Sequence, residues 1–302
     1  MAIGKVALVG ANGVLGPSVL QCLVADGFNV TVFKRASSSS SDEYHKSVHV
    51  TRYSDDVDVT SLSRMLKGQD AVVMTIRGNL SVQSMFAQAS AQAEVQRFIP
   101  ADFGSVDSSS SRAQKLVPLY RDKTALREEL MRLAKTHSNF SWTSLVCGHF
   151  FDWDPEFLHI WPLQHRAEIL DDGTVKWSAI TLGQAARATS RVLQRPPETG
   201  NRVLYVQSFT VSQNEVIEAF CRSTGTTVSD WDIKRLASSV YEQDEKKKAE
   251  SGDKGSVENL VWFLGTSSDA NWEDKEGFAM EQLGLENESL DAAVCNILSN
   301  HA

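Results

Sequence analysis

The stretch "KVALVGANGVLGPSVLQCLVADG", residues 5–27, decides the fold. Residues 5–9 are a short apolar run that predicts a buried strand. Glycines follow at positions 10, 13 and 16, and residues 17–27 have the apolar spacing of an amphipathic helix. A strand, a glycine-rich turn and a helix in this order are typical of the first unit of a doubly wound sheet.

The rest of the first half repeats this alternation. Further strands are predicted at residues 29–35, 48–55, 70–76, 97–102 and 141–148. Further helices are predicted at residues 60–68, 81–95 and 124–137. Strands that alternate with helices in this way indicate an α/β fold with a Rossmann-type doubly wound parallel sheet. Beyond about residue 152 the sequence becomes aromatic and irregular, and its last part is mainly helical.

The composition is that of a soluble globular protein, with 42% hydrophobic and 23% charged residues among 302. A net charge of −8 disfavours nucleic acid and anionic membranes as partners, because both attract clustered Lys and Arg. No apolar run approaches the roughly 20 residues of a membrane span. The N-terminus also lacks the pattern of a signal peptide. We therefore expect a cytoplasmic protein.

Cysteine and histidine are not arranged for a metal site. The sequence has no C-x-x-C motif and no histidine cluster at metal-ligand spacing, so we expect no metal. Free thiols in a reducing compartment are the simplest interpretation of the cysteines. The four cysteines are Cys22, Cys147, Cys221 and Cys295.

The glycine-rich turn predicts a dinucleotide site. The first glycine permits a tight turn, the second lets the backbone approach a pyrophosphate, and the third allows close packing of helix on strand. The amides at the start of the helix then face the anion. A glycine-rich turn with nothing bound is the alternative. The cofactor-binding residues predicted in this loop are Gly10, Asn12, Gly13, Val14, Leu15 and Gly16.

The end of the second strand favours NADP(H) over NAD(H). An acidic residue about 20 positions beyond the glycines would hold the ribose 2′-hydroxyl of NAD. Arg35 occupies that place instead, and no Asp or Glu occurs between Phe33 and Ser41. Lys34, Arg35 and the following serines would suit a 2′-phosphate, which a planar guanidinium binds well. Two surface cations at a strand end are the alternative.

These patterns divide the chain into two expected parts. Residues 1–152 are expected to form an NADP(H)-binding Rossmann domain, and residues 153–302 a smaller, mostly helical substrate-binding lobe. The boundary is not clean, because a strand near residues 202–208 has the composition to return to the main sheet.

Three polar stretches interrupt the alternation. The serine-rich segments 37–41 and 108–111 are predicted to be loops, and either flexible linkers or parts of a ligand site at the carboxyl ends of strands. The second is also a candidate lid. The charged run 242–256 predicts a solvated, mobile loop.

The segment "LVPLYRDKTALREEL", residues 116–130, holds Tyr120 and Lys123 three residues apart. Short-chain dehydrogenases use a Tyr-Lys pair as acid and base, but four residues apart. On a helix a step of three places the two side chains beside each other without that geometry. The segment therefore predicts an altered dehydrogenase, an enzyme that needs only the lysine, or an ordinary solvated lysine.

At this point the sequence resembles a known family. "VGANGVLG", the basic end of the second strand, "RFIPADFG", "YRDKTALREEL" and "SWTSLVCGHFFDW" are similar to the NmrA-like, isoflavone-reductase-like group of atypical short-chain dehydrogenases. The likeness is to its fungal-type branch and covers about residues 4–195. It implies an NADPH-dependent reductase of phenolic or other secondary metabolites. The group also contains dinucleotide-binding regulators without established turnover.

The resemblance assigns the acid/base role to one lysine, and Lys123 is the matching position. Tyr120 then either walls the substrate pocket or packs in the core. Thr75 and Ile76 end the fourth strand beside the pyrophosphate and ribose. In "PADFG", residues 100–104, the fifth strand is followed by three positions expected to line the nicotinamide ribose. These are Asp102, Phe103 and Gly104.

The segment "CGHFFDW", residues 147–153, is expected to pass the nicotinamide. Gly148 would let the backbone approach the ring. His149 is a candidate proton donor to the substrate, and equally a candidate structural histidine. The aromatic residues suit a flat substrate, and equally a hydrophobic seam between the two parts. They are Phe150, Phe151 and Trp153.

The leading interpretation is an NADPH-dependent reductase of a small aromatic or polyketide-like metabolite, with Lys123 as acid and base. A non-catalytic protein that senses NADP(H) is the runner-up, and a non-redox isomerase or dehydratase is a third. The loops at 77–81 and 105–112 depart from the plant pattern, so plant substrates do not carry over. A monomer or a homodimer is expected.

Overall fold

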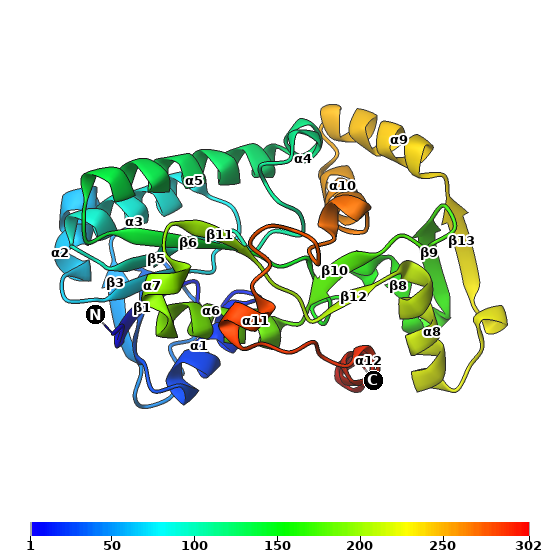
Figure 1. The fold of residues 1–302 in the computed structure, drawn as a ribbon, viewed down its shortest axis with the longest axis horizontal. Coiled ribbons are helices and arrows are strands. Elements are labelled where there is room, and N and C mark those ends of the chain that lie inside the picture. The colour runs from blue at the N-terminus through cyan, green and yellow to red at the C-terminus, as the bar shows by residue number, and fades with distance from the viewer. Residues whose placement is uncertain (1, 302) are drawn as a thin grey trace.

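A parallel sheet of seven strands forms the centre of the first part, in the order β11-β6-β5-β4-β1-β2-β3. The computed structural model describes residues 2–301. Figure 1 shows this sheet with helices on both faces. The strands are β1 (Lys5–Val9), β2 (Asn29–Arg35), β3 (His49–Tyr53), β4 (Ala71–Met74), β5 (Arg97–Ile99), β6 (Ser141–Val146) and β11 (Arg202–Tyr205). The predicted doubly wound α/β fold is confirmed.

Two helical layers bury the two faces of this sheet. The helices are α1 (Gly16–Ala25), α2 (Val59–Leu66), α3 (Leu80–Gln92), α5 (Pro118–Thr136) and α6 (Leu182–Gln194). One core lies under α1 and α6, and includes Val30 and Val32. The other lies under α2, α3 and α5, and includes Phe33 and Phe86. Successive residues of β2 thus enter opposite cores, as the alternation of a strand requires.

The strand order reverses beside β1, because β2 lies on one side of it and β4 on the other. In open α/β sheets, ligands bind outside the carboxyl ends of the strands at such a switch point. The glycine-rich turn between β1 and α1 lies at this point. The order of the strands therefore positions the expected cofactor loop.

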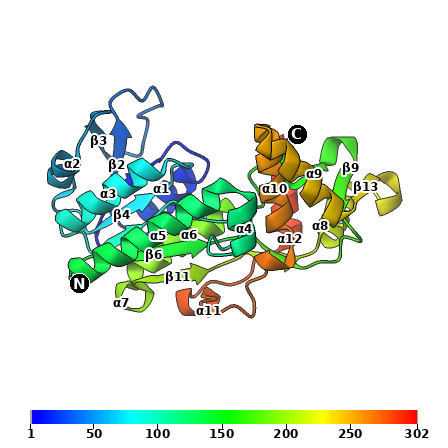
Figure 2. The same ribbon diagram turned by 90° about the horizontal axis from the view of Figure 1, so that it is seen from above.

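The second part lies beside the first (Figures 1 and 2). One small sheet contains β7 (His149–Phe150), β10 (Trp177–Ile180) and β12 (Phe209–Val211). Another contains β8 (Ile160–Trp161), β9 (Arg166–Leu170) and β13 (Asp232–Leu236). The short helices α4 (Ser111–Leu116), α7 (Pro196–Thr199) and α11 (Met280–Leu283) pack against α5 or α6 of the first part. The α-helices of the second part are α8 (Gln213–Thr224), α9 (Ser238–Glu250), α10 (Lys254–Gly265) and α12 (Leu290–His301). Four short 3-10 helices complete it at Glu156–Leu158, Pro162–Gln164, Val228–Asp230 and Ser268–Ala270. This part holds more strands than the sequence indicated.

The run at 202–209 is two strands in two sheets, not one. β11 pairs in parallel with β6, so the chain returns to the main sheet there. β12 pairs antiparallel with β10 in the second part. The intervening Gln207 is buried and accepts a hydrogen bond from Ser178 at 2.7 Å. This non-local bond anchors the chain where it leaves the sheet.

The prediction of a mobile loop at 242–256 was wrong, because most of this run is helix α9. Glu, Lys and Ala favour helix, and oppositely charged side chains one turn apart stabilise it. Glu245 faces inward and pairs with Lys248 at 2.6 Å and with Asn259 at 2.8 Å. The charged surface is therefore the outer side of a packed helix.

Two further observations concern the cysteines and the possibility of membrane-spanning helices. The four cysteines are free thiols, as predicted. Within residues 2–301, every helix is either too short or too polar to cross a lipid bilayer.

Candidate active site

The glycine loop has the geometry of an anion site. Gly10 has a φ of +98°, and a Cβ there would lie 2.9 Å from the backbone of Thr75. A Cβ on Gly16 would lie 2.1 Å from the carbonyl oxygen of Gly10. Both positions therefore require glycine for the fold itself. At Gly13 a Cβ would only touch its surroundings, at 3.4 Å or more, so a ligand better explains that glycine.

The first turn of α1 is open to a negatively charged group. Leu15 precedes the helix and supplies no side-chain cap, and no acidic residue occurs in the first turn. Asn12, Gly13 and Val14 are exposed in front of it. Amides at a helix start attract phosphate oxygens when no side chain occupies them. The loop thus fits a pyrophosphate.

The two cations at the end of β2 have different roles. Arg35 is exposed, and within residues 2–301 its guanidinium makes no hydrogen bond or ion pair. Lys34 is only 6% exposed and donates to the carbonyl oxygens of Ser40 and Ser41, both at 2.8 Å, and to Asp42 at 2.5 Å. Lys34 stays a predicted phosphate contact, but in this structure its three N–H donors hold the following loop.

The end of β4 connects the glycine loop with the lysine of α5. Thr75 is mostly buried and donates its hydroxyl to the carbonyl oxygen of Val9, at 3.1 Å. Ile76 follows, half-buried, beside Gly10. Gly78 and Asn79 then share with Lys123 the wall of a small cavity of about 20 Å³. Three predicted segments therefore meet at one edge of the sheet.

Lys123 lies on the inner side of α5, with its side chain 14% exposed. Its ammonium donates to the carbonyl oxygen of Asp102 and lies 3.8 Å from Oδ1 of the same residue. Burial lowers the pKa of Lys123, the Asp102 charge opposes that shift, and the Arg127 charge adds to it. A lysine with a lowered pKa is suited to proton transfer near neutral pH.

The Asp102 carboxylate is enclosed by protein side chains, and its place beside the nicotinamide ribose stays a prediction. It is buried, and its Oδ2 accepts from the Arg127 guanidinium at 2.6 Å and from the Ser144 hydroxyl. Its Oδ1 is a buried atom that has no hydrogen-bond partner within residues 2–301. The ammonium of Lys123 lies 3.8 Å from that atom. The carboxylate is therefore close enough to act electrostatically on the lysine.

Arg127 continues this network to a second carboxylate. It donates to Asp107 at 2.6 Å, and Asp107 also accepts from Tyr205 at 2.7 Å and Ser109 at 2.6 Å. Lys275 approaches Asp107 at 3.9 Å. Burial opposes ionisation of Asp107, but the Ser109 hydrogen bond and the Arg127 charge hold its pKa below the usual range. Charges of alternating sign thus run from Lys123 to Lys275.

This network corrects the interpretation of the second serine-rich loop. Ser105, Asp107 and Ser108 are buried, and Ser110 caps the short helix α4 by accepting from the amide of Ala113 at 3.3 Å. The segment is anchored by Arg127 and is therefore neither a flexible linker nor a lid. A serine-rich composition gave no sign of the buried aspartate within it.

The backbone beside Lys123 is strained. Phe103 has a φ of +35°, which is unusual for a bulky residue. The next residue, Gly104, would place a Cβ 2.6 Å from the carbonyl oxygen of Val106 and 3.7 Å from the ammonium of Lys123. Strained backbone is concentrated at functional sites in proteins. Phe103 and Gly104 remain predicted cofactor contacts on this evidence.

Tyr120 is 1% exposed and donates to or accepts from the hydroxyl of Ser105 at 2.8 Å. Its ring lies 5.8 Å from the ammonium of Lys123. Burial raises its pKa well above the usual range, so its phenol is a poor acid at neutral pH. This placement favours the core role that the sequence left open.

His149 lies in the apolar core, away from solvent. It is 2% exposed, and its Nε2 lies 3.2 Å from the carbonyl oxygen of Trp262. Burial lowers its pKa to about 4, so the ring is neutral at pH 7. A Cβ on Gly265 would lie 2.2 Å from the same nitrogen, which shows how closely α10 covers it. The structural interpretation of His149 is therefore favoured over the catalytic one.

The residues next to His149 comprise buried structural positions and half-buried candidates for substrate contact. Gly148 has a φ of +79°, and its Cβ would lie 2.0 Å from the carbonyl oxygen of Ser178, so packing on β10 is sufficient reason for glycine. Phe151 is fully buried against Phe209, with ring centroids 4.9 Å apart. Phe150 and Trp153 are half-buried and remain candidates for substrate contact.

Charged side chains link the two parts of the chain. Arg77, after β4, pairs with Glu258 of α10 at 2.7 Å. Arg112 of α4 pairs with Glu242 at 2.7 Å and with Asp269 at 3.3 Å. These contacts hold the second part beside the carboxyl edge of the sheet. These ion pairs could not be predicted from the sequence, because their members are far apart along the chain.

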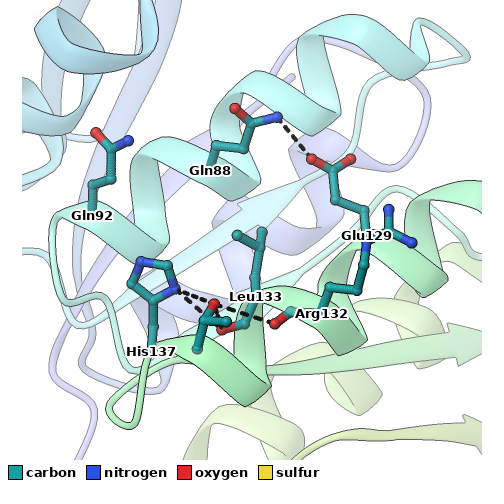
Figure 3. Close-up of a pocket in the computed structure, with 7 residues that line it drawn as sticks. Gln88, Gln92, Glu129, Arg132, Leu133 and His137 are labelled. Carbon is teal, nitrogen blue, oxygen red and sulfur yellow. Dashed lines mark hydrogen bonds between the residues drawn. The ribbon is translucent and has the colours of Figure 1, made fainter.

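A larger hollow of about 370 Å³ lies elsewhere, between α3 and α5 (Figure 3). Polar side chains form much of it, and Gln88 donates to Glu129 across it at 2.8 Å. None of the predicted site residues lines it. Its residues are Gln88, Gln92, Glu129, Arg132, Leu133, Thr136 and His137.

A parallel sheet with a glycine-rich turn at its switch point defines the class of Rossmann-type dinucleotide-binding folds. The model of the NmrA-like family matches residues 3–243 of this sequence. The chain belongs to the NmrA-like family, and the resemblance drawn from the sequence is confirmed.

Two fungal relatives cover most of the chain. The oxidoreductase aprR of Aspergillus flavus is 37% identical over 227 residues, which cover 74% of this chain and 74% of the relative. The oxidoreductase poxI of Penicillium oxalicum is 30% identical over 306 residues, which cover 95% of this chain and 92% of the relative.

Solved structures share the fold. One described as AtPrR2 with NADP⁺ and (+)pinoresinol has a TM-score of 0.80 at 21% identity, covering 98% of this chain and 99% of that chain. The binary complex of leucoanthocyanidin reductase with NADPH from Vitis vinifera has a TM-score of 0.74 at 15% identity, covering 98% and 100%. An isoflavone reductase has a TM-score of 0.73 at 19% identity, covering 97% and 99%.

The charge network predicts how the lysine titrates. Asp102→Asn should lower the pKa of Lys123 further, because the charge that favours the ammonium is lost while burial and Arg127 remain. Carbon-13 labelling of lysine and NMR across an alkaline titration measure this pKa, with Lys123→Arg to assign the signal. Asp122→Asn removes an exposed carboxylate next in sequence and is the control. An unchanged pKa in Asp102→Asn would show that the carboxylate does not act on Lys123.

Proposed function

We propose that this chain is an NADPH-dependent reductase of a small organic molecule. The observation that carries the proposal is one edge of the sheet, which joins an open glycine loop to a buried lysine. The glycine loop suits the pyrophosphate of an NADP dinucleotide, and the exposed Arg35 suits its 2′-phosphate. Lys123 lies further along the same edge. The names of the fungal relatives, and the cofactors in the titles of similar structures, support the same assignment.

When bound, the reduced nicotinamide would supply a hydride to an electrophilic carbon of the substrate. The oxygen of the substrate would take its proton from the ammonium of Lys123. The carbonyl oxygen of Asp102 holds that ammonium in place and leaves further N–H donors for a ligand oxygen. Arg127 and Ser144 fix Asp102 in turn. The acid is therefore held by a rigid support, as precise proton transfer requires.

For the substrate we propose an aromatic or polyketide-like metabolite. Trp153 and Phe157 support this, because both are half-buried and their ring centroids lie 5.4 Å apart. The two rings are inclined at 44° and together offer an apolar, aromatic surface to a ligand. The pinoresinol in a structure of similar fold is an aromatic molecule of this kind. Phe151 and Tyr120, which are fully enclosed, are not part of this proposed surface.

The cofactor assignment predicts a preference for NADPH over NADH of about tenfold or more, since charge-assisted hydrogen bonds contribute roughly 1.5–3 kcal/mol each. Arg35→Ala should remove most of that preference while leaving NADH affinity nearly unchanged. Fluorescence titration of both cofactors measures it. Arg64→Ala, an exposed arginine on α2, is the control for loss of one positive charge. Equal affinities in the wild type would refute the NADP(H) assignment.

The acid/base assignment predicts a contrast between two neighbouring residues. Lys123→Ala should slow single-turnover reduction at saturating NADPH by about 10²–10⁴-fold, the usual contribution of general acid catalysis. Tyr120→Phe should change the rate little, because its hydroxyl is buried against Ser105.

Loss of turnover in Tyr120→Phe alone would instead indicate a rearranged Tyr-Lys pair. Tight NADPH binding with no turnover of any phenolic or polyketide substrate would favour a non-catalytic NADP(H) sensor.

A further inference from the structure

The loop after β2 is held down by one carboxylate between two cations. Asp42 accepts from Lys34 at 2.5 Å and from Arg52 at 2.6 Å. Lys34 and Arg52 are register partners on β2 and β3. These hydrogen bonds hold the pKa of Asp42 below its usual range, so the group is anionic at neutral pH. Asp42 thus pairs with two cations at the end of the strands and offsets one of their two positive charges.

The same loop lies against the glycine loop. Asn12 donates to the carbonyl oxygen of Ser41 at 3.3 Å, and its side-chain oxygen accepts from Ser40 at 3.4 Å. Tyr44 also donates to that oxygen. In this class of fold the adenosine ribose lies between the glycine loop and the end of the second strand. Asp42 is therefore near the place where a 2′-phosphate would bind.

The number of N–H donors on Lys34 and Arg52 shows which of them are occupied by the Asp42 carboxylate. Lys34 has three N–H donors, and all three are used, one of them on Asp42. Arg52 uses one donor on Asp42 and others on the carbonyl oxygens of Arg35 and Ser38, both at 3.3 Å. Removal of the Asp42 charge would free one donor on each cation. While Asp42 stays in place, Lys34 has no free donor and Arg52 uses three of its five, so Arg35 is the cation whose whole guanidinium is available within residues 2–301.

We propose that Asp42 is an internal anion that competes with the ribose 2′-phosphate of the cofactor for Lys34 and Arg52. The inference rests on the proposed function, in that it needs a dinucleotide on the glycine loop. A phosphate monoester carries more charge and more acceptor oxygens than a carboxylate, so it can displace Asp42. The carboxylate limits how strongly this chain distinguishes a 2′-phosphate from a 2′-hydroxyl, and its departure releases the loop at residues 37–44.

Asp42→Asn tests this with fragments of the cofactor. Calorimetry should show that the Asp42→Asn variant binds 2′,5′-ADP about three- to tenfold more tightly than the wild type does. This is the range expected for an ion pair between partly exposed and partly buried. Binding of 5′-ADP, which has no 2′-phosphate, should stay within error. Asp56→Asn removes an exposed carboxylate from the turn after β3 and should change neither affinity. Arg52→Met in the Asp42→Asn background should reverse part of the gain.

Other results overturn the inference. Weaker binding of both fragments by Asp42→Asn would show that the carboxylate only supports the loop. An equal gain for both fragments would show that the effect does not concern the 2′-phosphate. If NADPH binds the wild type and Asp42→Asn changes nothing, the inference fails while the proposed function stands. If the wild type binds neither NADPH nor 2′,5′-ADP, both fail.

Discussion

The buried guanidinium of Arg127 is the interaction on which the site depends. It lies between Asp102 and Asp107, with a 2.6 Å contact to each. Through these two residues it joins α5 to the segment after β5, to β6 through Ser144 and to β11 through Tyr205. Loss of one member of such a group leaves an uncompensated buried charge, which costs about 3–5 kcal/mol. The side chains of the site are therefore held together by ion pairs that are buried in the core.

Burial in this core gives different environments to Tyr120 and Lys123, which are three residues apart in the sequence. Lys123 and Tyr120 lie on one face of α5, yet their environments shift their pKa values in opposite directions. Burial makes the lysine a better proton donor and the tyrosine a worse one. Asp102 also holds the ammonium of Lys123, whereas the phenol of Tyr120 is hydrogen-bonded to the hydroxyl of Ser105. These environments favour the proposed acid/base role of Lys123 over a role for Tyr120.

The local pattern of the sequence predicted much of the fold and only part of the site. Apolar runs predicted the strands of the main sheet, and the glycine turn predicted its own geometry, because both depend on neighbouring residues. Strand alternation would also have separated Lys34 from Arg35, since adjacent side chains face opposite sides of a sheet. Arg127 lies one turn after Lys123, so it was a charged residue on an apolar helix face and could have been noticed.

The remaining features depend on contacts between distant parts of the chain. His149 is buried because Trp262 and Gly265 of α10 cover it, and Gly148 is fixed by Ser178 of β10. The split of the run at 202–209 depends on Gln207 and its partner Ser178. The charged run that forms α9 depends on Glu245 finding Asn259. No local pattern contains this information.

The central claim is that one cofactor spans this edge, from the end of β2 to the lysine of α5. A crystal structure of the complex with NADP⁺ tests it most directly. The account predicts the pyrophosphate at the start of α1, the 2′-phosphate against Arg35, and the nicotinamide in contact with Lys123. A dinucleotide bound elsewhere, or a nicotinamide that does not reach Lys123, would contradict it.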